Sequence, residues 1–177
     1  MGGGSARRRG SGEHDEHHRP ARTARGVALG AGLLLFAGCG GSAEPLPAES
    51  AVPHYDAAAE VVLAELAGPE WALQENQRTV QEEDGACRYS PGVWNADQAL
   101  EGVSGGEGWD ALAERLDPVL AEHGFGDLGA PERSGALYSV RSQDAHGAEL
   151  VLDAQGRLAL RGALVDAETC TPEALGL

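Results

Sequence analysis

Residues 136–166 contain three apolar runs joined by two short turns, and this stretch decides the expected fold. The runs are Ala136-Leu-Tyr-Ser-Val-Arg-Ser142, Ala148-Glu-Leu-Val-Leu-Asp153 and Arg157-Leu-Ala-Leu-Arg-Gly-Ala-Leu-Val-Asp166. The turns are Asp144-Ala-His-Gly147 and Asp153-Ala-Gln-Gly156. Alternation of apolar and polar residues predicts strands, and turns this short favour antiparallel pairing. We therefore expect the C-terminal part of the chain to form an antiparallel sheet.

Two helices and two more strands are expected before this stretch. Residues 54–67 and 109–123 carry apolar side chains at helical spacing, although Pro118 should bend or break the second helix. Residues 71–80 and 86–94 have the pattern of extended segments. The predicted fold is α+β: a single antiparallel sheet of about five strands with two helices packed on one face, in the order αββαβββ.

The N-terminal segment has the pattern of an export signal. Arg22 and Arg25 precede an apolar run over residues 27–38, which is too short to cross a bilayer because a spanning helix needs roughly 20 apolar residues. The run ends at Phe36-Ala37-Gly38-Cys39, which resembles the lipobox of a bacterial lipoprotein signal peptide. The resemblance implies that residues 1–38 are removed and that Cys39 carries lipid. The protein would then be held at the extracytoplasmic face of the cell membrane.

The remainder of the chain divides into a tether and a domain. Residues 39–53 are rich in Pro, Gly and Ser without periodicity, which predicts a flexible stalk. Residues 54–177 are long enough to bury an independent core. From Cys39 onward the chain holds seven Arg, no Lys and 25 acidic residues, a formal charge of −18. Such a surface repels nucleic acid and anionic headgroups, so attachment to a membrane would depend on the lipid.

Four motifs are spread over most of residues 54–172. They are Gly68-Pro-Glu-Trp71, Gly85-Ala-Cys87-Arg-Tyr89, Leu120-Ala-Glu-His-Gly-Phe125 and the strand Leu158-Ala-Leu160 leading to Cys170. In these motifs the domain sequence resembles uncharacterised secreted lipoproteins of high-GC Gram-positive bacteria. The resemblance implies an envelope location and no particular activity.

Gly102-Val-Ser104-Gly-Gly106 matches the G-x-S-x-G pattern of a hydrolase nucleophile. Either Asp127 or Asp144, with His146, could complete a triad in the required order. That elbow normally belongs to a large parallel sheet, which an antiparallel domain of this size cannot build. A small envelope serine hydrolase that uses Ser104 is therefore the alternative function. A glycine-rich loop without catalysis is the simpler interpretation.

No metal or cofactor site is expected. His14-Asp-Glu-His17-His18 lies in the segment predicted to be removed. The remaining histidines, His54, His123 and His146, fall on different predicted elements without the spacing of metal ligands. Gly124-Phe-Gly-Asp-Leu-Gly129 fits a dinucleotide-binding pattern by letters, but it follows a helix where a strand is required.

The last three strands carry Arg141, Arg157 and Arg161, with Arg157 and Arg161 on one face. These arginines are weak candidates for binding an anion or an acidic partner. Cross-strand pairing with nearby acids is the other interpretation, and the sequence favours it.

Cys87 and Cys170 remain once Cys39 is occupied by lipid, and an oxidising compartment favours a disulfide between them. Two buried free thiols are the other possibility.

Together these features predict a lipid-anchored envelope protein with a non-catalytic binding or accessory domain. Its partner would be an envelope protein or a small ligand.

Overall fold

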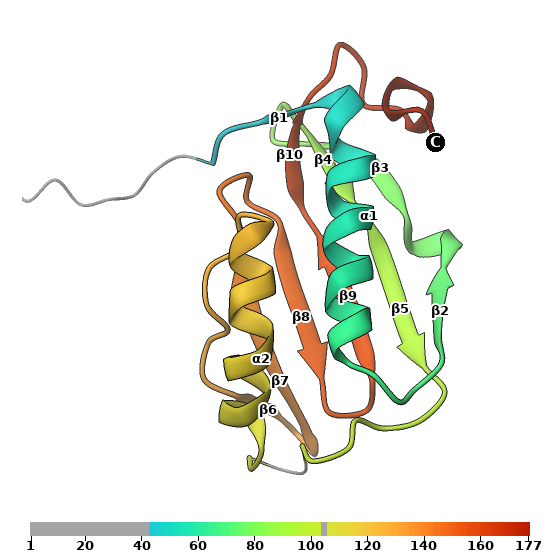
Figure 1. The fold of residues 1–177 in the computed structure, drawn as a ribbon. Helices are drawn as coiled ribbons and strands as arrows, with labels where there is room; N and C mark the ends of the chain where they lie inside the picture. Colours follow the sequence, from blue (N-terminus) through green and yellow to red (C-terminus); the bar gives the residue numbers. More distant parts are fainter. Residues whose placement is uncertain (1–42, 104–105) are drawn as a thin grey trace, which may run out of the picture. The chain divides into compact units, whose positions relative to one another are not determined.

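Two β-sheets and two helices share one core in the computed structural model (Figure 1). The model describes residues 43–103 and 106–177, and Cys39 and Ser104 lie outside these ranges. The strands are β1 (Leu46–Pro47), β2 (Trp71–Gln74), β3 (Thr79–Glu83), β4 (Ala86–Ser90), β5 (Gly92–Ala96), β6 (Glu132–Ser134), β7 (Leu137–Gln143), β8 (Glu149–Asp153), β9 (Arg157–Arg161) and β10 (Ala163–Asp166). The helices are α1 (Ala48–Glu65) and α2 (Trp109–Glu122), with 3₁₀ turns η1 (Glu75–Gln77) and η2 (Pro172–Leu175).

The smaller sheet has the order β1-β10-β4-β3, in which β1 runs parallel to β10 and the other pairs are antiparallel. The larger sheet is antiparallel, with the order β2-β5-β9-β8-β7-β6. Both helices lie on the same side of these strands (Figure 1). The described part of the domain is therefore mostly β-structure, with its helices on one face.

The prediction of a single sheet of about five strands in the order αββαβββ is wrong. Three of the predicted strands each contribute to both sheets, because their chains are interrupted part way along. The run over residues 71–80 is divided by η1, with β2 in the larger sheet and the start of β3 in the smaller sheet. The run from Ala86 is divided at Pro91, which has no N–H to donate to a ladder, and at Gly92, whose φ is +140°. The run from Arg157 is divided at Gly162, whose φ is +80°.

The stalk predicted for residues 39–53 is wrong over residues 46–53. Residues 46–47 form β1, and residues 48–53 are the start of α1, which continues through Pro53. The helix is held by packing, since Ala51 and Tyr55 are completely buried in the core. The Pro, Gly and Ser content of this stretch concealed that apolar face.

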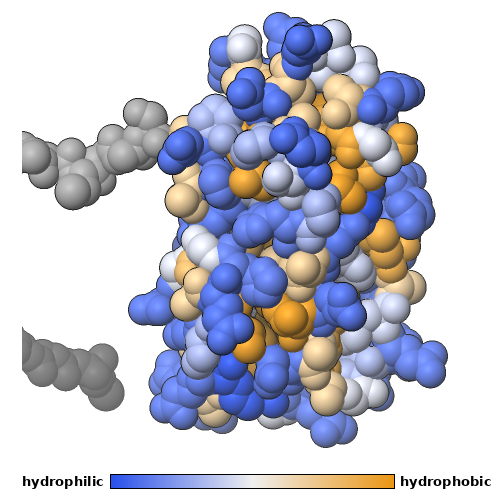
Figure 2. Space-filling view, turned by 45° about the horizontal axis from the view of Figure 1, so that its top comes forward, coloured by the Kyte–Doolittle hydropathy of each residue, from blue (hydrophilic) through white to orange (hydrophobic). Residues whose placement is uncertain are grey.

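Helix α2 confirms the prediction made from the apolar spacing of residues 109–123, but it continues through Pro118 without a break. Its inward face carries Trp109, Leu112, Leu116 and Leu120, which are all buried. Side chains from both helices and both sheets join one apolar cluster. The face of the domain seen in Figure 2 is mostly hydrophilic, with hydrophobic residues in small separate groups.

The predicted disulfide between Cys87 and Cys170 is present, with Cα atoms 5.2 Å apart. Cys87 lies on β4, and Cys170 lies two residues before the start of η2. The bond therefore ties the C-terminal turn to the smaller sheet. Leu175 in this turn is buried in the core beside α1.

Removal of this disulfide should destabilise the fold. The two cysteines are 83 residues apart, and on the chain-entropy model closing such a loop is worth roughly 4–5 kcal/mol. We expect Cys87→Ala and Cys170→Ala each to lower the melting temperature, with the double variant no worse than either single variant. Thermal unfolding followed by circular dichroism compares the melting temperatures of the two single variants and the double variant. Two reactive thiols besides Cys39 in the denatured, unreduced chain would contradict the bond.

Candidate functional site

A cavity of about 420 Å³ opens between the end of α1 and the start of α2, and we call it the interhelical cavity. Its volume falls within the range of small-molecule sites in proteins. Three segments supply its walls: the exit from α1, the loop before α2, and the first turns of α2. The lining residues are Leu66, Ala67, Gly68, Pro69, Gln98, Leu100, Glu101, Gly102, Val103, Gly108, Ala111, Leu112 and Arg115.

The first half of the loop that forms one wall is held by hydrogen bonds at Asp97 and Leu100. The N–H of Asp97 donates to the carbonyl of Glu70 at 2.9 Å, and the N–H of Glu70 donates to Oδ1 of Asp97 at 2.9 Å. Further along, the N–H of Leu100 donates to the carbonyl of Ala154 at 3.1 Å. These bonds fix the loop against the exit from α1 and against the β8–β9 turn, so its first half forms a defined wall.

Gly108 brings the two ends of this loop together. Its φ is +82°, and a Cβ at this position would lie 1.7 Å from the carbonyl oxygen of Gly102. Only glycine permits this approach. The next residue, Trp109, is 2% exposed and fixes the start of α2 in the core. The glycine at position 108 and the buried Trp109 therefore fix the backbone at the mouth of the cavity.

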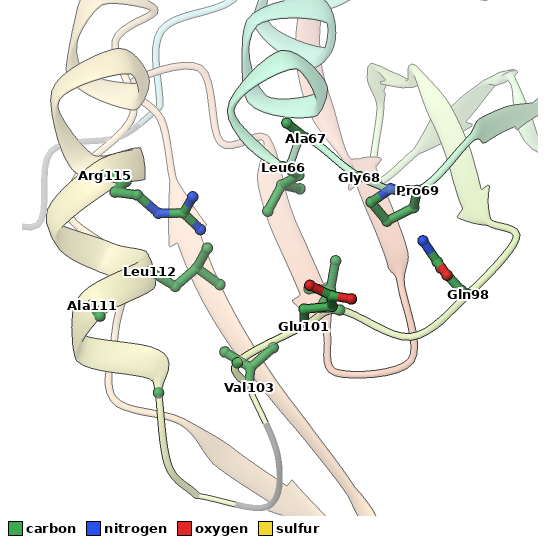
Figure 3. Close-up of a pocket in the computed structure, with 13 residues that line it drawn as sticks. Leu66, Ala67, Gly68, Pro69, Gln98, Glu101, Val103, Ala111, Leu112 and Arg115 are labelled. Atoms are coloured by element: carbon green, nitrogen blue, oxygen red, sulfur yellow. The ribbon is translucent and has the colours of Figure 1, made fainter.

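The cavity combines apolar walls with a few polar groups. Figure 3 shows Arg115 extending from α2 toward the space beside Leu66, with Glu101 on the loop across from it. The only hydrogen bond described for the guanidinium of Arg115 is a long one, 3.5 Å, to the carbonyl of Glu65. Among the described residues no carboxylate forms an ion pair with Arg115. Its donors are therefore available to a ligand that carries an acceptor.

The hydrolase alternative finds no support in the described residues. Ser104 lies outside them, but its neighbour Val103 lines the interhelical cavity beside Leu66, at the end of α1. His146 lies near the start of α1, with its ring centroid 6.0 Å from that of His54. Leu66 is twelve residues beyond His54, which is roughly 18 Å along a helix. The fold thus separates His146 from the segment that flanks Ser104.

The three histidines that the sequence placed on separate elements come together in space. The ring of His54 on α1 lies 6.3 Å from that of His123, at the end of α2, and 6.0 Å from that of His146, in the β7–β8 turn. No group of three or more His, Cys, Asp and Glu residues within 43–103 and 106–177 is arranged to hold a metal ion. Their separation along the chain is why sequence spacing gave no sign of this cluster.

A buried carboxylate organises the residues beneath the histidines. Asp144 is 8% exposed, and its Oδ2 accepts a hydrogen bond of 2.7 Å from the hydroxyl of Tyr55. Its Oδ1 accepts from the N–H groups of His146, at 2.9 Å, and Ala148, at 2.7 Å. Burial, followed by the hydrogen bond to Asp144, raises the pKa of Tyr55 far above its ordinary value. Tyr55 therefore remains a neutral donor across the physiological range.

The candidate anion-binding arginines are mostly paired with acids. Arg141 contacts Glu149 at 2.5 Å and Glu132 at 3.0 Å, and Arg161 contacts Glu149 at 2.6 Å. Partial burial would raise the pKa of Glu149, but hydrogen bonds from Arg141 and Arg161 outweigh it and hold the pKa below its usual value. The cross-strand interpretation is therefore the better one for Arg141 and Arg161. Arg157 is exposed and forms no ion pair with a described residue.

The fold is similar to that of the "putative lipoprotein LppA" from Mycobacterium tuberculosis. The TM-score is 0.51 with 15% sequence identity, over 75% of this chain and 83% of that chain. An identity this low shows a common fold and nothing further. No protein-family model matches the sequence, and neither does any curated protein. The expected likeness to actinobacterial lipoproteins is thus supported at the level of the fold.

Neither helix in the described residues has the length and hydropathy needed to cross a membrane. The apolar run over residues 27–38 and the proposed lipid site at Cys39 lie outside those residues.

The interhelical cavity could not be predicted from the sequence, because its apolar walls come from segments far apart in the chain.

Two buried tyrosines test the role of Asp144. Tyr55 and Tyr89 are both 0% exposed, but the hydroxyl of Tyr89 has no hydrogen-bond partner among the described residues. Tyr55→Phe should lower the free energy of unfolding by about 1–3 kcal/mol, because it leaves a buried carboxylate oxygen unsatisfied. Tyr89→Phe should be neutral or stabilising. Urea unfolding of both variants decides this, and equal losses would contradict the assigned role of Asp144.

Proposed function

We propose that this chain is a lipid-anchored protein of the extracytoplasmic membrane face, with a non-catalytic domain that binds a small ligand in the interhelical cavity. The signal pattern ending at Cys39 supports the anchor. The Cys87–Cys170 disulfide supports export to an oxidising compartment. The fold similarity to a protein named as a lipoprotein agrees with both.

The observation that carries the binding role is the composition of the interhelical cavity. Its polar side chains are those of Gln98, Glu101 and Arg115, and no His, Cys, Ser or Lys is among its described lining residues. Covalent or acid–base catalysis normally needs a nucleophile with an adjacent base, which this set does not provide. Apolar walls with one available guanidinium favour a small amphipathic molecule that carries an anionic acceptor. The binding energy would come from the walls and the orientation from Arg115.

The anchor is tested by Cys39→Ser in the full chain, expressed in an actinobacterial host. We expect loss of acyl labelling and loss of the protein from the washed membrane fraction, because no other residue would carry lipid. Ser42→Ala, three residues away, is the matched control and should keep both properties. A mature N-terminus other than Cys39, or an unmodified Cys39, found by mass spectrometry would contradict the proposal.

The binding role is tested with anilinonaphthalene sulfonate, which combines an apolar ring system with an anion. We expect one probe to bind per chain, with strong fluorescence enhancement, and Ala111→Trp to abolish this by filling the cavity. Ala121→Trp is the control, since Ala121 is also exposed on α2 but does not line the cavity. Arg115→Met should weaken binding about tenfold, the loss expected for one charge-assisted hydrogen bond of about 1.4 kcal/mol. Equal binding by all variants would place the probe elsewhere.

A further inference from the structure

We propose that His54, His123 and His146 form a proton-sensitive cluster that holds the entry segment, residues 43–47, against the domain at neutral pH and releases it in acid. The entry segment connects the domain to Cys39. The consequence for the anchor rests on the proposed lipidation, whereas the release itself does not. No single residue would reveal this role, because it depends on three histidines from three separate elements.

The entry segment is fastened mainly to the β7–β8 turn, which carries His146. The N–H of Glu44 donates to the carbonyl of Ala145 at 3.0 Å. In return, the carbonyl of Glu44 is 2.6 Å from Nδ1 of His146, and a carbonyl can only accept, so Nδ1 carries the hydrogen. The short strand β1 then pairs with β10 through two residues, Leu46 opposite Val165 and Pro47 opposite Asp166. Leu46 also packs against the core, so the contacts of Glu44 hold the part of the segment that precedes β1.

His54 connects this turn to both helices. Its Nε2 atom is buried and has no hydrogen-bond partner among the described residues. Burial lowers the pKa of His54, and the nearby His146 and His123 lower it further, while Asp144 opposes them. A proton on His54 would therefore be placed in a partly desolvated position, facing two groups that also become cations.

The groups around His54 compensate only one positive charge. Asp144 is the buried acid below the cluster, and it already accepts hydrogen bonds from Tyr55 and from two backbone N–H groups. Tyr55 stays neutral, and Glu44 presents its backbone carbonyl to His146. Two or three imidazolium rings with centroids about 6 Å apart would repel one another. Moving the turn that bears His146 relieves the repulsion and separates it from Glu44.

The direction of the pH effect follows from the lowered pKa of His54. The unfolded chain binds a proton near the ordinary histidine pKa of about 6.5, and a released state in which His146 has moved away loses one of the groups that lower the pKa of His54. The closed state is therefore favoured above that pH, and it loses stability as the pH falls below it. A single histidine with an ordinary pKa in both states would give no such dependence.

Amide hydrogen exchange on the full chain in mild detergent tests the release. After correction for intrinsic rates, protection of the Glu44 and Leu46 amides should fall at least tenfold between pH 7.5 and pH 5.5. The amides of β8 should change less than twofold, which separates local release from general acid unfolding. Equal protection of the entry segment at both pH values would overturn the proposal.

Two variants assign the effect to the cluster. His123→Gln removes one facing cation and touches none of the hydrogen bonds of the entry segment, so the acid-induced loss should shrink to less than threefold. His54→Gln should have the same effect, and His123→Gln keeps the test valid if that variant fails to fold. The NMR titration of His54 should show a pKa below that of the urea-unfolded chain, rising in His123→Gln. If the acid-induced loss of protection in the entry segment is the same in His123→Gln as in the unmodified chain, the histidine cluster does not control the release.

Discussion

The hydrogen bond from Tyr55 to the buried carboxylate of Asp144 joins parts of the chain that are 89 residues apart. It fixes α1 to the β7–β8 turn, and the other oxygen of Asp144 shapes that turn by accepting from two backbone N–H groups. A carboxylate this buried is costly unless its oxygens are satisfied. The contact between α1 and the turn, and with it the approach of His54 to His146, depends on that satisfaction. The same residues that stabilise the fold therefore create its most unusual polar cluster.

A second constraint is the change of sheet along three neighbouring strands. β4 continues into β5 across Pro91, and β10 follows β9 across Gly162, so two antiparallel neighbours pass from one sheet to the other together. Because the interruption falls at the same level in both, their pairing is kept on each side of it. The two sheets can then cover α1 along its length while sharing one core. The next neighbour changes sheet as well, because η1 separates β2, which pairs with β5, from β3, which pairs with β4. Breaks at the same place in three adjacent strands thus accompany the division into two sheets.

These features explain what the sequence could and could not predict. The C-terminal hairpins, helix α2 and the Cys87–Cys170 disulfide depend on local periodicity, turn residues and redox compartment, which a single sequence contains. The division into two sheets could not be predicted, because Pro91 and Gly162 resemble ordinary irregularities inside a strand. The N-terminal half of α1 was missed because burial of Ala51 and Tyr55 outweighs a Pro-rich composition. The interhelical cavity and the histidine cluster form only when distant segments meet.

The distribution of charge separates structural arginines from one that is available for binding. Within residues 43–103 and 106–177, Arg78, Arg88, Arg141 and Arg161 form ion pairs with acids. Acidic residues far outnumber arginines in this chain, so most arginines can find a carboxylate partner. An arginine without one among the described residues is therefore a candidate for another role. Arg133 lies over the ring of Tyr138, and Arg157 is exposed away from the cavity. Arg115 borders the interhelical cavity, and the hydrogen bond described for its guanidinium is a long one to the carbonyl of Glu65. A net negative surface would repel anions at long range, so a ligand held there must gain most of its affinity from the apolar walls and use Arg115 for orientation.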